Sequence, residues 1–153
     1  MAFPSTTGTK RDDLQGAWQQ ARSLAAAIKT QTQNVRAQSA AGTLGASVLL
    51  AYLTEVADVR TQLLIDAAVP GIGAYAQSQI NDATFDVSAA FTAMVNQLTS
   101  ARDWIIANFP KDASGFLLAQ TLAADGHQQD RVFTAAQTAG LRTTLDALLA
   151  TID

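Results

Sequence analysis

The chain has 153 residues, of which 48% are hydrophobic and 15% charged, and its formal net charge is −3. This length suits a single domain with its own hydrophobic core. Since the sequence contains no cysteine, disulfides, thiolate chemistry and cysteine-ligated metal centres are excluded. The first residues lack the order of a signal peptide, and the most apolar window, 46–53, is far shorter than the roughly 20 residues of a membrane span. We therefore expect a soluble protein without a signal peptide.

Residues 1–11 have the composition of an extended arm. They combine Phe3 and Pro4 with Gly8 and a run of serine and threonine, a mixture that forms no core. Such terminal segments are poorly ordered unless another element or molecule holds them. We therefore divide the chain into an extended N-terminal arm, 1–11, and one helical-bundle domain, 12–153, and we expect Phe3 and Pro4 to contact a neighbouring molecule.

A heptad pattern predicts a long first helix from about Asp12 to about Ala41. Apolar residues recur at every seventh position, namely at Leu14, Ala21, Ile28 and Val35. Asp12 or Asp13 can cap the start of the helix, and Gly42 and Gly45 interrupt the pattern. About 30 residues form a rod of roughly 45 Å. The two glycines allow this rod either to fold back on the next helix or to extend to a neighbouring molecule.

Three cations, Arg22, Lys29 and Arg36, form a row along this helix, in a stretch (14–54) without any acidic residue. With Trp18 available for stacking, the row could bind the phosphate groups of a nucleic acid. The negative charge of the whole chain argues against that interpretation, because a protein that binds phosphates is usually basic. An acidic protein partner is a further alternative.

The interpretation that we prefer is a ladder of ion pairs between the first two helices. In an antiparallel register each cation faces an acidic or amide side chain: Arg36 faces Glu55, Lys29 faces Asp58 or Gln62, and Arg22 faces Asp66. Residues 55–153 carry eleven acidic side chains against five basic ones, so the two parts of the chain are complementary in charge. Each exposed pair contributes only about 0.2 to 1 kcal/mol. We therefore expect the ladder to orient the helices more than to stabilise them.

Periodic apolar residues predict three further helices in the middle of the chain. The second helix covers about 47–67 and stops before Pro70, which can begin a short third helix that reaches Ile80. Asp86 is placed to cap the fourth helix. That helix carries one apolar stripe and ends at the Phe-Pro pair of residues 109–110.

The pattern then changes to short apolar runs between residues 116 and 133, separated by Asp125-Gly126, a strong signal for a β-hairpin. A two-residue turn gives two pairs of facing residues, Leu118 with Phe133 and Gln120 with Arg131, and a longer loop is equally compatible with the sequence. An isolated hairpin is marginally stable. It must therefore pack on the bundle or join the sheet of a neighbour.

The last helix follows a capping box formed by Thr134 and Gln137, and it is rich in leucine. The whole sequence therefore predicts a mainly α fold. We expect a bundle of four to five helices with a long N-terminal helix and one small β-hairpin, at about 116–133, before the last helix.

His127, the only histidine, follows the Asp-Gly turn of the predicted hairpin. A role as a general base would need an orienting carboxylate, which Asp125 or Asp130 could supply. The sequence contains neither a nucleophilic cysteine nor a Gly-x-Ser-x-Gly motif, and no acidic pair or calcium-loop pattern stands out. We therefore expect neither catalysis nor a metal or cofactor site, and we treat His127 as a contact residue at the hairpin tip.

Three aromatic residues, Trp104, Phe109 and Phe116, flank the connection Phe-Pro-Lys-Asp-Ala-Ser-Gly. An exposed aromatic patch would indicate a binding surface. We favour the other interpretation, in which these side chains close one end of the bundle.

Two stretches carry a resemblance to a known class of protein. They are Trp-Ile-Ile-Ala-Asn-Phe-Pro-Lys-Asp-Ala-Ser-Gly-Phe-Leu (104–117) and Ala-Asp-Gly-His-Gln-Gln-Asp-Arg-Val-Phe-Thr-Ala-Ala-Gln (124–137), followed by a leucine-rich helix. This C-terminal third of the chain resembles small structural proteins of tailed bacteriophages. The resemblance implies a virion component, associated with the capsid, neck or tail, and hence a location in the virus particle. A chain that is not encoded by a phage would be cytoplasmic.

We therefore expect a structural or assembly protein without enzymatic activity. Its expected partners are other copies of itself or other virion proteins, and not a membrane, a nucleic acid or a small-molecule substrate. The alternative is a helical module that binds a nucleic acid or a regulatory protein through the cationic row. The residues expected to make contacts are Phe3, Pro4, Trp18, Arg22, Lys29, Arg36 and His127.

Overall fold

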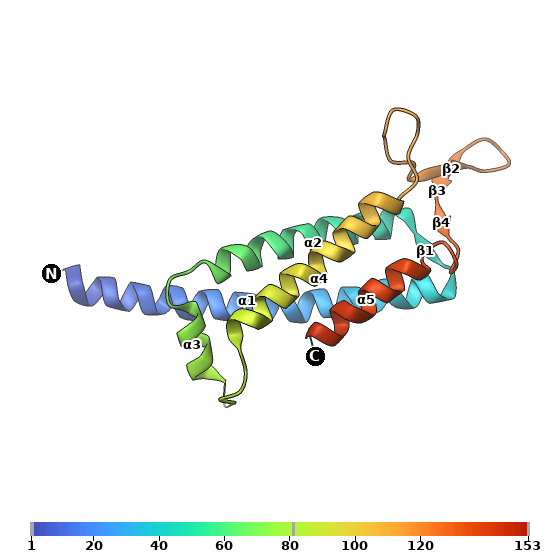
Figure 1. Ribbon diagram of the computed structural model, residues 1–153. Coiled ribbons are helices and arrows are strands. Elements are labelled where there is room, and N and C mark those ends of the chain that lie inside the picture. The colour runs from blue at the N-terminus through green and yellow to red at the C-terminus, as the bar shows by residue number, and fades with distance from the viewer. Residues whose placement is uncertain (1, 81, 153) are drawn as a thin grey trace.

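The computed structural model describes residues 2–80 and 82–152, with side chains from residue 14 onward (Figure 1). Within that part the chain forms five helices and four short strands. The helices are α1 (Ala2–Ala41), α2 (Ala46–Ala67), α3 (Ile72–Gln79), α4 (Val87–Asn108) and α5 (Ala139–Ile152). The strands are β1 (Leu44–Gly45), β2 (Gln120–Leu122), β3 (Gln128–Asp130) and β4 (Val132–Phe133). The predicted mainly α fold with a small hairpin before the last helix is confirmed.

Four of the helices form an antiparallel bundle. Both α1 and α4 pack against α2 and α5, so each of these four helices has two neighbours. The short α3 connects α2 to α4 and lies against α1. The largest fully buried side chains come from α1, β1, α2, α4 and α5: Tyr52, Ile28, Leu44, Leu49, Leu98, Ile105, Leu141, Leu145 and Leu148. The heptad face of α1 therefore supplies one wall of the core.

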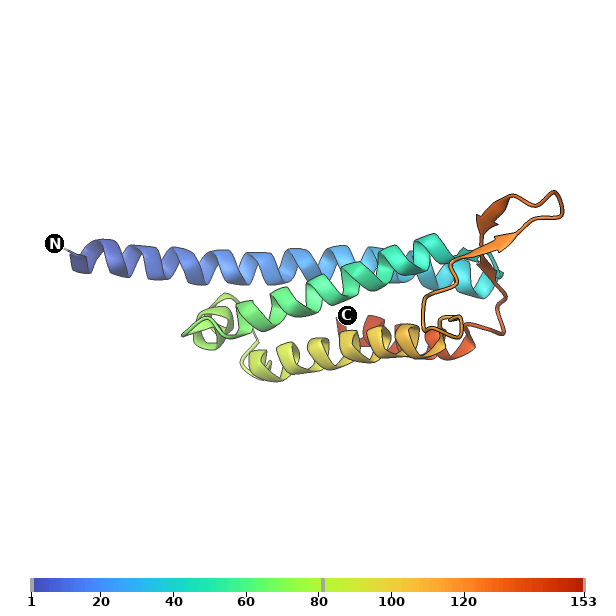
Figure 2. The ribbon, with the colours of Figure 1, turned by 90° about the horizontal axis from the view of Figure 1, so that it is seen from above.

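The helix α1 is longer than the sequence predicts at its N-terminal end. It begins at Ala2, so residues 2–11 continue the helix and do not form the extended arm that was expected. Pro4 is compatible with this position because the N–H groups of a first helical turn have no partner within the helix. With 40 residues, α1 is about 60 Å long, and its N-terminal part extends beyond the other helices (Figure 2).

The other helix boundaries agree with the sequence prediction to within a few residues. The helix α1 ends at Ala41, where Gly42 adopts a φ of +71° and the Thr43 N–H donates to the Gln38 carbonyl at 3.0 Å. Asp86 caps α4, since its side chain accepts from the Ala89 N–H at 3.0 Å. The capping box is confirmed as well, because Thr134 and Gln137 exchange hydrogen bonds of 2.9 and 3.2 Å.

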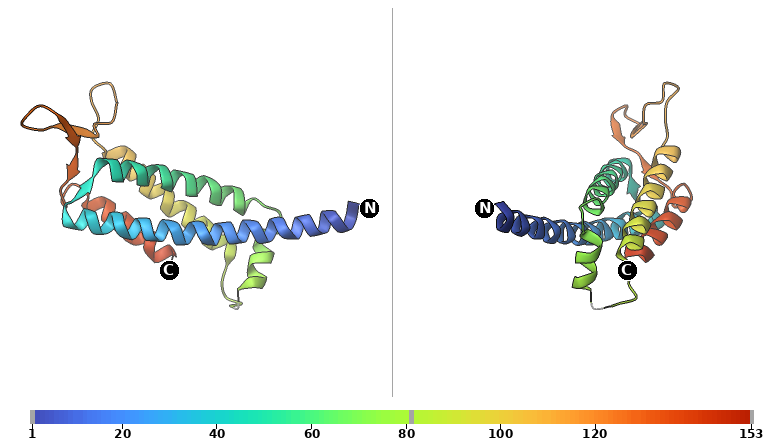
Figure 3. Two further views of the ribbon diagram at one scale, coloured as in Figure 1. Left: turned by 180° about the vertical axis from the view of Figure 1, so that it is seen from behind. Right: turned by 60° about the vertical axis from the view of Figure 1, so that its left-hand side comes forward.

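The predicted hairpin is present, but its two-residue register is wrong. In the β2–β3 pair, Gln120 lies opposite Asp130 and Leu122 opposite Gln128, so the loop at the tip is longer. Phe133 does not face Leu118, because the chain turns after β3 and β4 pairs with β1, which places Phe133 opposite Leu44. The hairpin is thereby attached to the junction of α1 and α2. It projects from the end of the bundle opposite to the N-terminus (Figure 3).

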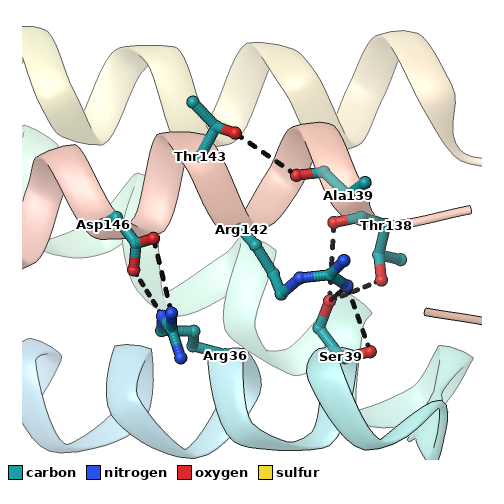
Figure 4. A network of polar contacts seen from close by, with 7 residues as sticks. All are labelled: Arg36, Ser39, Thr138, Ala139, Arg142, Thr143 and Asp146. Atoms are coloured by element: carbon teal, nitrogen blue, oxygen red, sulfur yellow. Dashed lines mark hydrogen bonds and ion pairs between the residues drawn. The ribbon is translucent and has the colours of Figure 1, made fainter. Parts of the chain in front are cut away.

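A polar network holds the C-terminal end of α1 against the start of α5 (Figure 4). The guanidinium of Arg142 donates to the Ser39 carbonyl at 3.2 Å, to Ser39 Oγ at 3.0 Å and to the Ala135 carbonyl at 2.7 Å. Ser39 Oγ also hydrogen-bonds the Thr138 hydroxyl. Ser39 and Thr138 are both fully buried. The cation therefore satisfies carbonyl groups near a helix C-terminus, where positive charge is favoured.

Candidate functional site

The structure contradicts two of the three predicted pairs between α1 and α2. Arg36 pairs with Asp146 of α5 instead of Glu55, and this contact raises the pKa of the Arg36 guanidinium. Arg22 is exposed and makes no hydrogen bond or ion pair with another described residue, and the buried Asp66 accepts a hydrogen bond from Gln62 at 3.3 Å. The pairs of Arg36 with Glu55 and of Arg22 with Asp66 were therefore predicted wrongly.

The cause is the register of the two helices. The Thr32 and Tyr52 hydroxyls share a buried hydrogen bond of 2.7 Å, and Gln62 donates to Gln20 at 3.0 Å. The predicted register would have placed Thr32 opposite residues 56–59. The core therefore aligns α1 and α2 by a buried polar pair and apolar packing, and exposed charges do not set the alignment.

An apolar cavity of about 240 Å³ opens between α1, α4 and the end of α5. It lies where the first turns of α4 meet α1 and the last residues of α5. Its walls are mainly apolar: Trp18, Ala21, Ala25, Leu63, Phe85, Val87, Ala90, Phe91, Met94 and Ile152, with Arg22 and Thr151. Two residues expected to make contacts, Trp18 and Arg22, are thus brought together at one cavity. We call this end of the bundle the cavity end.

Buried polar groups near the cavity end are incompletely satisfied. Trp18 packs edge-to-face on Phe91, with ring centroids 6.4 Å apart, and its indole nitrogen is buried. That nitrogen and Asp66 Oδ2 are the buried side-chain atoms without a hydrogen-bond partner in the described part of the chain. Burial raises the pKa of the Asp66 carboxyl, and the hydrogen bond from Gln62 opposes this rise. An unpartnered buried acceptor costs about 1–3 kcal/mol, so this end of the bundle is not optimised for stability.

The opposite end, which we call the hairpin end, exposes large apolar side chains. Phe116 and Leu122 are each 71% exposed and Val132 is 56% exposed. Leu117, Leu118 and, on α4, Ile106 are also exposed. The sequence prediction for the aromatic trio was therefore right for Phe109, which is buried, and wrong for Phe116. An exposed cluster of this kind is typical of an interaction surface.

The loop that carries Phe116 is closed by hydrogen bonds among its own residues. Asp112 Oδ1 accepts from the N–H groups of Ser114 and Phe116, each at 2.9 Å. The Asp112 N–H donates to the Phe116 carbonyl at 2.9 Å, and Gly115 closes the turn with a φ of +87° and a bond of 3.0 Å to the Asp112 carbonyl. The ammonium group of Lys111 donates to the Phe109 carbonyl at 3.0 Å. The loop therefore holds an exposed phenyl ring next to an exposed carboxylate.

Two other predicted contact residues with described side chains, His127 and Lys29, lie outside the lining of the cavity. His127 is exposed at the hairpin tip, where its ring hydrogen-bonds Asp125, and its own N–H donates to the same carboxylate at 3.2 Å. Lys29 is half-buried on α1. Phe3 and Pro4 fall among residues 2–13, whose side chains lie outside those that the structure describes.

The described residues contain neither a candidate metal site nor a candidate membrane span. No group of three or more histidine or acidic side chains there is arranged to hold a metal ion. None of the helices in that part is both long and apolar enough to span a membrane. Comparison with known proteins adds no assignment, because no protein-family model, curated protein or solved structure matches the chain.

Proposed function

We propose that this protein is a non-enzymatic assembly subunit, a component of a bacteriophage virion, that acts through contacts made by the two ends of its bundle. The observation that carries the proposal is the set of exposed apolar side chains at the hairpin end, of which Phe116 and Leu122 are the most exposed. Removing such groups from water drives protein association at roughly 25 cal/mol per Å² of apolar area. Apolar groups that hydrogen-bonded turns and strands hold at the surface are suited to a permanent contact.

Two further features support assembly. The short strands β2 and β3 form a two-stranded sheet, so each has an outer edge that can accept a strand from another chain. The N-terminal part of α1 extends beyond the other helices and can lie along a neighbouring subunit. The association with a virion rests on the resemblance of residues 104–117 and 124–137 to phage structural proteins.

The experiment that tests the proposal is the solution mass of the full chain, measured by light scattering after size-exclusion chromatography over a range of concentrations. We expect masses of several copies, and negative-stain electron microscopy should then show discrete rings or filaments. A mass of one chain at every concentration would contradict self-assembly.

The alternative of nucleic-acid binding can be tested in parallel. Arg36 is already paired with Asp146, which leaves a weaker cationic row than the sequence suggested. Fluorescence anisotropy with a labelled DNA duplex at low salt should show no binding. Binding that is lost when Arg22, Lys29 and Arg36 are changed together to glutamine would favour the alternative.

A further inference from the structure

We infer that the Phe116 loop of one copy inserts into the Trp18–Phe91 cavity of a second copy, so that subunits join head to tail. This inference rests on the proposed function and names the contact that would perform it. The cavity has a volume of about 240 Å³, and an engineered apolar cavity of about 150 Å³ is already large enough to bind benzene. A phenyl ring therefore fits. The aromatic walls formed by Trp18, Phe85 and Phe91 favour an aromatic guest.

The loop has the properties of an anchor that is organised before binding. Phe116 is 71% exposed, and four hydrogen bonds within residues 112–116 fix the turn that presents it. Little conformational entropy remains to be lost when such a loop docks, so more of the burial energy appears as affinity. Aromatic side chains that fill pockets are also frequent among the residues that dominate binding energy.

Charge is complementary between the loop and the cavity. Asp112 is exposed and holds the Phe116 N–H through one carboxylate oxygen, so an anion accompanies the ring. At the cavity, Arg22 is exposed and makes no ion pair with another described residue. Asp86, between the lining residues Phe85 and Val87, is engaged as the N-cap of α4. The docked loop can therefore place the Asp112 carboxylate beside the Arg22 guanidinium.

The same copy cannot supply both partners. Phe116 follows the C-terminal end of α4, whereas the cavity lies at the N-terminal end of that helix. The lining residue nearest to the end of α4, Met94, lies 14 residues before Asn108, which is about 21 Å along the helix. The loop does not extend over that distance, because the Leu118 N–H donates to the Pro110 carbonyl at 2.8 Å and Asp112 holds the Phe116 N–H within the closed turn. The guest must therefore come from another molecule.

Because the two surfaces lie at different ends of the bundle, the contact is heterologous. Each subunit offers one loop and one cavity, and a contact of that kind generates a closed ring or an open filament. Apolar side chains beside the two surfaces can enlarge the interface. These are Leu117 and Leu118 at the hairpin end, and Leu64, Ile65 and Phe85 at the cavity end.

The test uses the full chain with one variant for each surface. Phe116→Ser removes the anchor from an exposed position, so the fold should be retained; Leu122→Ser is the matched control, because Leu122 is equally exposed at the same end. Ala90→Phe fills the cavity from α4. Arg22→Glu reverses the charge beside the cavity, and Arg22 is exposed. This variant replaces Ala90→Phe as the cavity variant if circular dichroism shows that Ala90→Phe does not fold.

We expect Phe116→Ser to raise the Kd of association by roughly 30-fold or more, which is the smallest effect expected for a residue that dominates an interface. Leu122→Ser should change the Kd much less. The Phe116 variant and the cavity variant should each be monomeric. Mixed in equal amounts they should form a complex of only two chains, since one retains a cavity and the other a loop.

The outcomes separate this inference from the proposed function. Oligomers that persist in Phe116→Ser, or that are lost equally in Leu122→Ser, would overturn the inference and leave self-assembly standing. Loss of assembly in both surface variants without a two-chain complex in the mixture would also overturn it. A wild-type chain that is monomeric at every concentration would overturn both.

Discussion

The two ends of the bundle differ in how completely their polar groups are satisfied. At the hairpin end, buried Ser39 and Thr138 bond each other, and Arg142 spans two helices. At the cavity end, Trp18 Nε1 and Asp66 Oδ2 are buried without partners in the described part of the chain, and an apolar cavity remains. Regions of lower stability are where binding functions are usually found. The difference indicates that the hairpin end contributes more to the stability of the fold than the cavity end.

Two aromatic pairs allow a direct comparison of the ends. Phe133 is buried and packs edge-to-face on Phe109 at the hairpin end, with centroids 5.6 Å apart, whereas Phe91 is half-buried against Trp18. We expect Phe133→Ala to lower the free energy of unfolding by about 3–5 kcal/mol and Phe91→Ala to lower it by less than half as much. Urea denaturation of both variants measures this. Equal losses would remove the proposed difference between the ends.

Tyr52 lies in the second turn of α2, and its hydroxyl is a probe of how well the core excludes water. Burial raises the pKa of the Tyr52 hydroxyl to about 12, with the bond to Thr32 opposing the rise and the charge of Glu55 adding to it. The unfolded chain loses this proton near pH 10. The contribution to stability is therefore fully present below pH 10 and is lost as the pH rises through about 12, a change of about 2–3 kcal/mol.

The measurement is the free energy of unfolding between pH 9 and pH 12, with Tyr52→Phe as the control. The control removes this ionisation and should show a shallower decline over the same range. Parallel curves for the two proteins would mean that Tyr52 is accessible to water.

Asp66 offers a smaller effect at the cavity end, and its contribution to stability depends on pH in the same direction as that of Tyr52. Since burial raises the pKa of Asp66 in the folded state, its contribution to stability is present in acid, below the unfolded value, and is lost as the pH rises through the folded value. Asp66→Asn should therefore raise the free energy of unfolding at pH 7 by about 1 kcal/mol. Thermal denaturation at pH 7 and in mild acid should show that this gain shrinks as the pH falls. A loss of stability at pH 7 would show that the charged carboxylate has a stabilising partner.

The helices and their caps could be predicted from local signals in the sequence. The caps are local because Asp86, Thr134 and Gln137 each form hydrogen bonds with a residue three positions away. Contacts between distant residues were missed. The partner of Phe133 is Leu44 and that of Arg36 is Asp146, and both come from elements that local periodicity does not bring together. For the candidate site, the sequence predicted Trp18 and Arg22 as contact residues about one turn apart on one helix, and the structure brings both to the lining of the cavity. The cavity itself is lined by residues of α1, α2, α4 and α5, and local periodicity does not show how these helices pack together.

Phe116 illustrates a signal that was present but weighed wrongly. Its neighbours Asp112, Ser114 and Gly115 are turn-forming residues, and a turn of this kind carries side chains away from the core. The aromatic character of Phe116 suggested burial. The turn chemistry decided its position, since the closed loop leaves the ring at the surface.

The contacts between the end of α1 and α5 have a consequence for the order in which the chain can fold. The helices α1 and α2 are joined by a short turn and can pair as soon as both are synthesised. The end of α1, however, can make its contacts with α5 only after that helix is synthesised. Thr138 follows its partner Ser39 by 99 residues, and Asp146 follows its partner Arg36 by 110 residues. During synthesis, the apolar faces of the first two helices therefore stay uncovered until α4 and α5 emerge. Completion of the bundle, rather than helix formation, should limit the folding rate.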